Sequence, residues 1–331
     1  MKAGVYMRTR VLFVLLCVPM LSAALTGCTS TLPYVPEPQP LERGQLPAPD
    51  IAVRIPGLGP CTDQVDRVLH LNSQQAVTVL VHGCKGSAGR FRTLAQLYAF
   101  HGQQAVCFSY NDHDSLVTAS GELINALDGL AGHMQNHSTT VMGHSMGGLV
   151  ARKALVSDRP GPWQRTNVDL KLVTISAPFA GISAAETCGW KGVGWWSLGT
   201  IVVACKLITG DNWYEITSAS DFIRRPGPLL PTVQKYLKIV TDERNTCRRE
   251  DENGRCLESD YIFSLAEQYQ PRVDSSPQLT NVKIAAGHVE IVGEKHVPPR
   301  KLLNILQQEG LLVSTPPERR AALDRLLVEL Y

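Results

Sequence analysis

One stretch decides the fold of this chain: residues Val141–Gly148, Val-Met-Gly-His-Ser-Met-Gly-Gly. A short apolar strand signal ends there in the pattern Gly-x-Ser-x-Gly and passes directly into the helix-like run 149–155. A serine on such a sharp strand-to-helix turn projects its hydroxyl above the sheet, and glycines two residues before and after it let the helix pass close to the strand. The pattern therefore predicts a nucleophile elbow, with Ser145 as the nucleophile.

Strand and helix signals alternate on both sides of this elbow. Val77–Val81 is a continuous apolar, β-branched run, which is typical of a strand buried on both faces. Such alternation indicates an α/β fold with a mostly parallel, doubly wound sheet. Ligands of these sheets bind beyond the carboxyl ends of the strands, where His82 and Ser145 would meet. The pattern predicts strands at 76–81, 104–108, 139–142, 170–175, 236–241 and 282–286, and helices at 91–100, 116–134, from 149 and from 299.

The N-terminus has the features of a secretory signal. The first ten residues carry three basic side chains and precede the apolar stretch 11–25, which is the order found in signal peptides. The stretch closes with Leu-Thr-Gly-Cys at 25–28, which resembles the lipobox of bacterial lipoproteins. We therefore expect residues 1–27 to be removed and Cys28 to become the lipidated first residue. An ordinary signal peptide cleaved near residue 23 or 24, or an uncleaved anchor, is the alternative.

The lipoprotein resemblance also implies a location in the cell envelope. Thr29 follows the cysteine, in place of the aspartate that commonly retains such proteins in the inner membrane. The resemblance thus implies the outer membrane, with the chain facing the periplasm. Residues 28–50 are rich in proline and poor in large apolar side chains, which indicates a semi-extended tether to a single domain at 51–331.

The chain beyond the leader is almost neutral. Without the three basic residues of the leader, 29 lysines and arginines stand against 30 aspartates and glutamates. This balance gives no indication of a nucleic-acid partner. No Cys-x-x-Cys spacing supports a zinc site, and we expect neither a metal nor an organic cofactor.

Seven cysteines lie beyond the lipobox, and in an oxidising periplasm several should pair. Cys247 and Cys256 flank a charged loop, and Cys188 and Cys205 bracket a segment rich in glycine and tryptophan. These are the two disulfides that we predict. The odd count leaves at least one of the seven outside intramolecular pairs.

The chain resembles the α/β-hydrolase family, and within it bacterial secreted lipases and esterases. The resemblance covers roughly residues 77–305 and rests on three motifs, namely His82-Gly83 after the first central strand, the elbow, and Ser176–Gly181 after the next strand. Phe179 departs from the lipase pattern, which usually has a polar residue after the proline. The resemblance implies the α/β-hydrolase fold and a catalytic triad in the order serine, acid, histidine.

A serine nucleophile needs a base that takes its proton and an acid that fixes the tautomer of that base. Only two histidines follow Ser145: His288 comes after the last predicted strand and is the predicted base, and His296 is the alternative. The acid is expected at Asp260, in a segment that resembles Ser-Asp-Gly-x-Val of lipases with a tyrosine in place of the glycine. Asp242, directly after the strand 236–241, is the rival, and either aspartate could instead cap a helix.

The resemblance further implies an oxyanion hole built from backbone amides. These are the amides of Met146, next to the nucleophile, and of Cys84, after His82-Gly83; a redox role for the Cys84 thiol is the alternative.

The stretch between the strands 170–175 and 236–241 is too long for one crossover helix. Its part at about 181–232 is a candidate cap, rich in tryptophan, isoleucine, valine and glycine, which suits an acyl-chain pocket or a lid. Plain core packing is the alternative for these apolar residues.

Together these features predict a membrane-tethered extracytoplasmic serine hydrolase that cleaves carboxylic esters of apolar acyl groups through an acyl-enzyme on Ser145. Its expected partners are a lipid or other apolar acyl ester and the membrane. Lipases, phospholipases, esterases, thioesterases and acyltransferases share this apparatus, and the sequence does not separate them. An envelope lipoprotein with an inactive site and a binding role is the alternative from another class.

Overall fold

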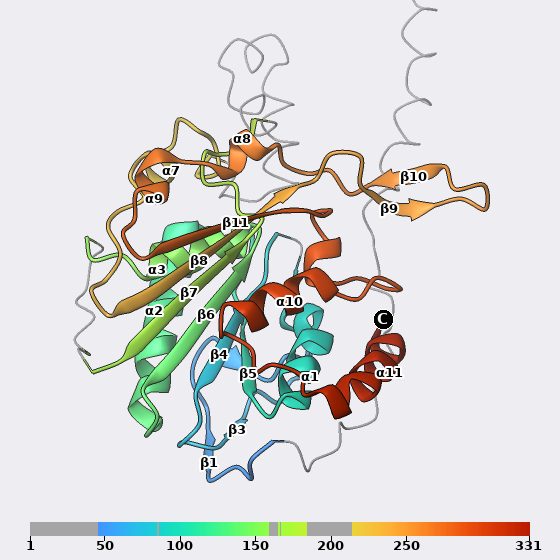
Figure 1. Ribbon diagram of the computed structural model, residues 1–331. Coiled ribbons are helices and arrows are strands. Elements are labelled where there is room, and N and C mark those ends of the chain that lie inside the picture. Colours follow the sequence, from blue (N-terminus) through green and yellow to red (C-terminus); the bar gives the residue numbers. More distant parts are fainter. Residues whose placement is uncertain (1–45, 85, 159–164, 166, 184–213) are drawn as a thin grey trace, which may run out of the picture. The chain divides into compact units, whose positions relative to one another are not determined.

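A computed structural model describes residues 46–84, 86–158, 165, 167–183 and 214–331. A seven-stranded sheet forms the centre of this part of the chain (Figure 1). Its strands, in spatial order, are β11 (Leu279–Ala285), β8 (Val233–Asp242), β7 (Asp169–Ile175), β6 (Ser138–His144), β4 (Val77–Val81), β5 (Gln104–Phe108) and β2 (Leu58–Gly59). All of these strands run parallel to their neighbours except β2, which pairs antiparallel with β5 at the edge.

The strand order reverses in the middle of the sheet, because the chain goes from β4 outward to β5 and then returns past β4 to β6. Val81, the last residue of β4, is paired with Gly143 near the end of β6. The segments that follow these two strands therefore leave the sheet side by side. This is the topological switch point at which doubly wound sheets bind their ligands, and it brings the segment at His82 next to Ser145.

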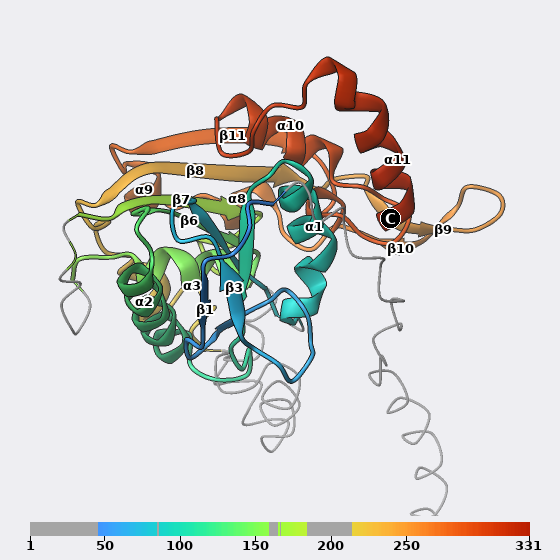
Figure 2. The ribbon, with the colours of Figure 1, turned by 90° about the horizontal axis from the view of Figure 1, so that it is seen from below.

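Helices cover both faces of the sheet, as the two views in Figures 1 and 2 show. One core joins the sheet to α2 (Leu116–His133) and α3 (Met146–Ala154). The other joins it to α1 (Arg92–Phe100), α10 (Arg300–Gln308) and α11 (Arg320–Leu330). Strand alternation explains the division, since neighbouring residues of a strand point to opposite faces: Val79 and Val81 belong to the first core and Leu80 to the second.

Local signals account for the long helix α2. The side chain of Ser115 caps its N-terminus by accepting from the backbone N–H groups of Val117 and Thr118. Leu123, Leu127 and Leu130 recur on one face at the predicted spacing, and all three are buried. The fold class expected from the sequence, a mostly parallel sheet flanked by helices, is confirmed, and the six predicted strands are present as β4 to β8 and β11.

Short elements complete the described part of the chain, and the sequence analysis did not predict them. β1 and β3 form one antiparallel pair, and β9 and β10 form another. The bounds are β1 (Ile51–Val53), β3 (Leu69–Leu71), η1 (Ala88–Phe91), α7 (Asp221–Arg224), β9 (Cys247–Glu250), β10 (Cys256–Ser259), α8 (Leu265–Gln268), α9 (Pro271–Asp274), η3 (Glu290–Val292) and η4 (Pro317–Arg319). None of the helices searched in the described residues is long and apolar enough to span a bilayer.

Two disulfides fasten the described residues. The predicted bridge between Cys247 and Cys256 is confirmed and ties β9 to β10. The bridge between Cys61 and Cys107 joins the segment after the edge strand β2 to β5 and was not predicted. Cys188, Cys205 and the lipobox at Cys28 lie outside the described residues, as does most of the predicted cap.

Candidate active site

Ser145 occupies the sharp turn between β6 and α3. Its backbone angles are φ 57° and ψ −128°, so it lies in a region that non-glycine residues rarely adopt. The strained turn is fixed by backbone hydrogen bonds: Ser145 N–H donates to the Ile175 carbonyl at 2.8 Å, and Gly148 N–H donates to the Ser145 carbonyl at 2.9 Å. Strain of this kind is a recurring feature of functional sites, and the geometry is that of the elbow expected from the sequence.

The glycines of the elbow allow α3 to contact neighbouring backbone. A Cβ on Gly143 would lie 2.2 Å from the Gly147 carbonyl oxygen. A Cβ on Gly147 would lie 2.3 Å from the carbonyl oxygens of Val81 and His82. Any side chain at these positions would therefore push the helix away from β4 and β6 and displace the serine.

His288 lies beside this elbow, in the loop between β11 and η3. Its ring and the ring of His144 have centroids 4.7 Å apart, and His144 Nε2 lies 2.8 Å from the His288 carbonyl oxygen. Burial and the neighbouring His288 lower the pKa of His144 well below its ordinary value. His144 is therefore neutral, and its Nε2–H donates to the backbone of His288. The residue before Ser145 thus holds the loop that carries His288.

The carboxylate that contacts the His288 ring belongs to Glu243, the residue directly after β8. His288 Nδ1 lies 2.9 Å from Glu243 Oε1, and the Glu243 side chain is completely buried. A carboxylate is an obligatory acceptor here, so Nδ1 carries the ring proton and Nε2 is left with a lone pair. This is the tautomer that a general base needs in a serine triad.

Several other donors surround Glu243. Its Oε2 accepts from the backbone N–H groups of Ile262 at 2.6 Å and Phe263 at 2.8 Å, and its Oε1 accepts from the hydroxyls of Ser176 and Thr241. Burial raises the pKa of Glu243, but the hydrogen bonds from His288, Ser176 and Phe263 outweigh it, so the pKa lies below its ordinary value. The buried group is consequently a carboxylate at neutral pH.

The structure contradicts the assignment of the triad acid to Asp260. Its carboxylate does not hold the ring but accepts from the backbone N–H groups of Val289 at 3.0 Å and Glu290 at 2.9 Å, and its carbonyl accepts from His288 N–H at 2.9 Å. Burial raises the pKa of this carboxyl group. Asp260 holds the turn that carries His288 through these backbone N–H groups, and it does not cap the helix that follows it in the chain, because the N-cap of α8 is Ser264.

Asp242 and His296 also lie away from the His288 ring. Asp242 forms ion pairs with Arg244 at 2.6 Å and Lys283 at 3.7 Å, and the hydrogen bond from Arg244 lowers its pKa to about 2. His296 is exposed, and its backbone N–H donates to the carbonyl of Tyr331. β8 extends one residue further than predicted, so Asp242 still belongs to the strand and the next residue, Glu243, turns to the opposite side.

The loop expected to form the oxyanion hole packs on the nucleophile. A Cβ on Gly83 would lie 2.9 Å from Cβ of Ser145, so only glycine lets this loop approach so closely. The ring of His82 stacks on Tyr110 with centroids 4.4 Å apart, and the Tyr110 hydroxyl donates to the His82 carbonyl at 2.8 Å. These contacts fix the loop that continues into the exposed Cys84. Met146 begins α3 directly after Ser145, so the two segments predicted to supply the amides meet at Ser145.

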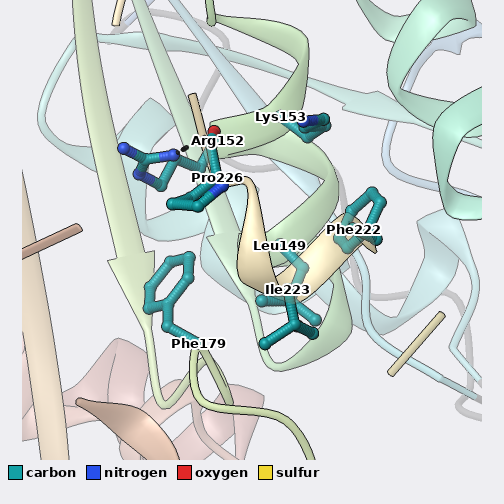
Figure 3. A pocket seen from close by; sticks show the side chains of 7 residues that line it. All are labelled: Leu149, Arg152, Lys153, Phe179, Phe222, Ile223 and Pro226. Atoms are coloured by element: carbon teal, nitrogen blue, oxygen red, sulfur yellow. Dashed lines mark hydrogen bonds between the residues drawn. The ribbon is translucent and has the colours of Figure 1, made fainter. Parts of the chain in front are cut away.

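A small pocket on α3 is separate from this constellation. Figure 3 shows Phe179, Phe222 and Ile223 facing Leu149, with Arg152 bonded to the Pro226 carbonyl at 2.7 Å. Neither Ser145, Glu243 nor His288 lines it. The pocket therefore belongs to the packing of α7 on α3 and not to the reaction site. In the described residues no cluster of three or more histidine, cysteine, aspartate or glutamate side chains is arranged to bind a metal ion.

Comparisons with known proteins agree with this architecture. The model of one protein family, the PGAP1-like alpha/beta domain, matches residues 72–187. The lipase BlEst2 of Bacillus licheniformis in its propeptide form has a TM-score of 0.51 at 15% identity, with coverage of 78% of this chain and 53% of that one. Its mature form has a TM-score of 0.48 at 15% identity, with coverage of 77% and 97%.

A more distant likeness is to an esterase of Pyrococcus furiosus, with a TM-score of 0.42 at 14% identity and coverage of 89% of this chain and 95% of that one. No curated protein matches the chain in sequence. The sheet order, the elbow and the match to the PGAP1-like domain lead to one conclusion: the chain has the α/β-hydrolase fold, to which lipases and esterases also belong.

Proposed function

We propose that this chain is a serine hydrolase of carboxylic esters, with Ser145 as nucleophile, His288 as base and Glu243 as acid. One observation carries the proposal: the serine strained at φ 57° directly follows His144, which contacts His288, and the Nδ1 of His288 is bonded to a buried carboxylate at 2.9 Å. Each part has a low probability outside a catalytic site, because strained backbone and buried charge both cost stability. Their combination at the switch point of the sheet supports catalysis over a binding role.

In the proposed reaction, Nε2 of His288 takes the proton of the Ser145 hydroxyl while the Ser145 oxygen attacks the carbonyl carbon of the ester. The imidazolium that forms is stabilised by the Glu243 carboxylate on Nδ1. His288 then gives the proton to the leaving alcohol, and an acyl-enzyme remains on Ser145. A water molecule, deprotonated by His288 in the same way, then attacks the acyl-enzyme and releases the carboxylic acid. Backbone amides of Cys84 and Met146 would stabilise the oxyanion, each with an effect of about 10²- to 10³-fold on kcat.

The proposed substrates are esters of apolar acyl groups. Support comes from the fold shared with lipases and esterases and from the apolar composition of the cap segment, whose residues 184–213 lie outside the described part.

The proposed enzyme acts outside the cytoplasm, tethered by lipid at Cys28 to the outer membrane. Two disulfides support an oxidising compartment, because such bonds are rare in the cytosol. Loss of radioactive palmitate incorporation in Cys28→Ala would support the tether; unchanged incorporation would contradict it.

The decisive experiment combines labelling with hydrolysis. The purified chain and Ser145→Ala are treated with a fluorophosphonate probe and assayed on p-nitrophenyl esters from acetate to palmitate. We expect labelling and turnover by the parent and neither by the variant, with the preferred chain length separating an esterase from a lipase. A folded parent that neither reacts with the probe nor cleaves any ester would contradict the proposal and favour a binding role. Labelling without turnover would instead favour transfer to an acceptor other than water.

A further inference from the structure

A second strained serine ends the strand next to the elbow. Ser176 follows β7 with φ 47°, and its N–H donates to the Ile239 carbonyl of β8 at 2.9 Å. Ser145 repeats this arrangement one strand away, because its N–H donates to the Ile175 carbonyl of β7 at 2.8 Å. β6, β7 and β8 lie side by side in the sheet (Figure 1). Two neighbouring strands thus end in a serine with left-handed backbone.

The strain at Ser176 needs a reason, since glycine adopts this conformation without steric cost. The hydroxyl of Ser176 supplies one. It is completely buried and lies 2.7 Å from Glu243 Oε1, 2.9 Å from His288 Nδ1 and 2.7 Å from the Thr241 hydroxyl. A glycine would remove the strain and all three contacts.

The donors and acceptors fix the direction of these bonds. Glu243 accepts only, so the Ser176 hydroxyl donates to Oε1. The Ser176 oxygen then accepts, and both the Thr241 hydroxyl and the Nδ1–H of His288 are within reach of it. The ring proton of His288 therefore lies between two acceptors, Glu243 Oε1 and Ser176 Oγ, which limits rotation of the imidazole.

We propose that Ser176 is a positioning residue for the ester hydrolysis proposed above: its hydroxyl locks Glu243 and the His288 ring in one geometry, with Nε2 directed toward the nucleophile. The inference rests on the proposed function. Outer partners of this kind orient the groups that do the chemistry. The strained backbone is the conformation from which the hydroxyl reaches both members of the pair.

Two variants separate the hydroxyl from the strain. Ser176→Ala and Ser176→Gly both lack the hydroxyl, and only the glycine relieves the backbone. We expect kcat to fall about 10- to 100-fold in both, the effect of a lost hydrogen bond to a charged group, with KM changed less than about twofold. The rate of fluorophosphonate labelling should fall in parallel. Ser176→Gly should melt about 2–4 °C above Ser176→Ala.

A matched control removes a buried hydroxyl elsewhere. Ser120 is buried in α2 and donates to the Leu116 carbonyl at 2.6 Å, and Ser120→Ala should keep the kcat of the parent. A purely structural role for Ser176 predicts that the two variants differ in activity, with Ser176→Gly recovering the kcat of the parent as stability returns, and that result would overturn the inference. So would labelling of both Ser176 variants at the rate of the parent. Failure of the parent itself to label would instead refute the proposed hydrolase.

Discussion

Two buried acids approach His288 from different regions, and they do different things. Glu243 follows β8 and contacts the ring, whereas Asp260 follows β10 and contacts the backbone of the turn after His288. Both are almost completely buried. Residue type and burial therefore do not identify a triad acid; the atom of the histidine that the carboxylate contacts does. Glu243 fixes the ring tautomer of His288, and Asp260 holds the backbone of the turn that carries it.

The comparison is sharpest in a pair of isosteric amides. Glu243→Gln replaces the acceptor at His288 Nδ1 by a group that can favour the wrong tautomer, and kcat should fall about 10³- to 10⁴-fold. Asp260→Asn keeps an oxygen that can accept from Val289 and Glu290, so kcat should stay within about tenfold of the parent. Steady-state hydrolysis of the preferred p-nitrophenyl ester measures both. The reverse order would return the role of the acid to Asp260.

A smaller loss of kcat is expected from changing Thr241, which contacts Glu243 and not the His288 ring. The single hydroxyl proton of Thr241 is shared between two acceptors, Glu243 Oε1 at 2.9 Å and the Ser176 hydroxyl oxygen at 2.7 Å. Thr241→Val keeps the shape and removes this hydroxyl, and kcat should fall about 3- to 10-fold, the effect of one net hydrogen bond. The same assay on Thr241→Ser, which keeps the donor, should give the activity of the parent. Equal losses in the two variants would assign the effect to packing.

The two acids should also respond to pH with opposite signs. The pKa of Glu243 lies below its ordinary value, so its contribution to stability is present above that value and is lost as pH falls through the folded pKa. The pKa of Asp260 is raised, so its contribution is present below the ordinary value and is lost as pH rises through the folded pKa. On acidification from pH 7 to 3, the melting temperature of the parent should first rise relative to that of Asp260→Asn and then, below about pH 4.5, approach that of Glu243→Gln. Parallel slopes would contradict this assignment of charge.

The elbow shows how much of this site could be read from sequence. Local backbone requirements leave a local signature, and Gly143, Ser145 and Gly147 carry it within five residues. The strands of the buried sheet were equally visible, because burial on both faces demands continuous apolar runs. A parallel sheet brings the carboxyl ends of its strands to one edge, which is why His82 and Ser145 were expected to meet there.

The contact of Glu243 with the His288 ring could not be predicted from the sequence, for a physical reason. Whether Asp242 or Glu243 faces the base depends on the last residue of β8, and one residue in register reverses the direction of a side chain. Asp260 was preferred because its surroundings resemble a lipase motif, although its carboxylate caps a turn. The bridge between Cys61 and Cys107 spans 46 residues and depends on tertiary structure alone, whereas the hairpin bridge between Cys247 and Cys256 was apparent from local spacing.

That hairpin bridge provides the smallest expected effect on chemistry. Cys247→Ser/Cys256→Ser opens β9 and β10, which lie between Glu243 and Asp260 in the chain, and should reduce the free energy of unfolding by about 2–3 kcal/mol. Below the melting temperature kcat should remain within about twofold of the parent, because Ile262 and Phe263, which donate to Glu243, lie outside the bridged loop. Thermal melts and ester hydrolysis at 20 °C measure the two quantities. A tenfold loss of kcat would mean that the hairpin positions the acid, and the division between the region that does chemistry and the region that stabilises it would then have to be drawn beyond β10.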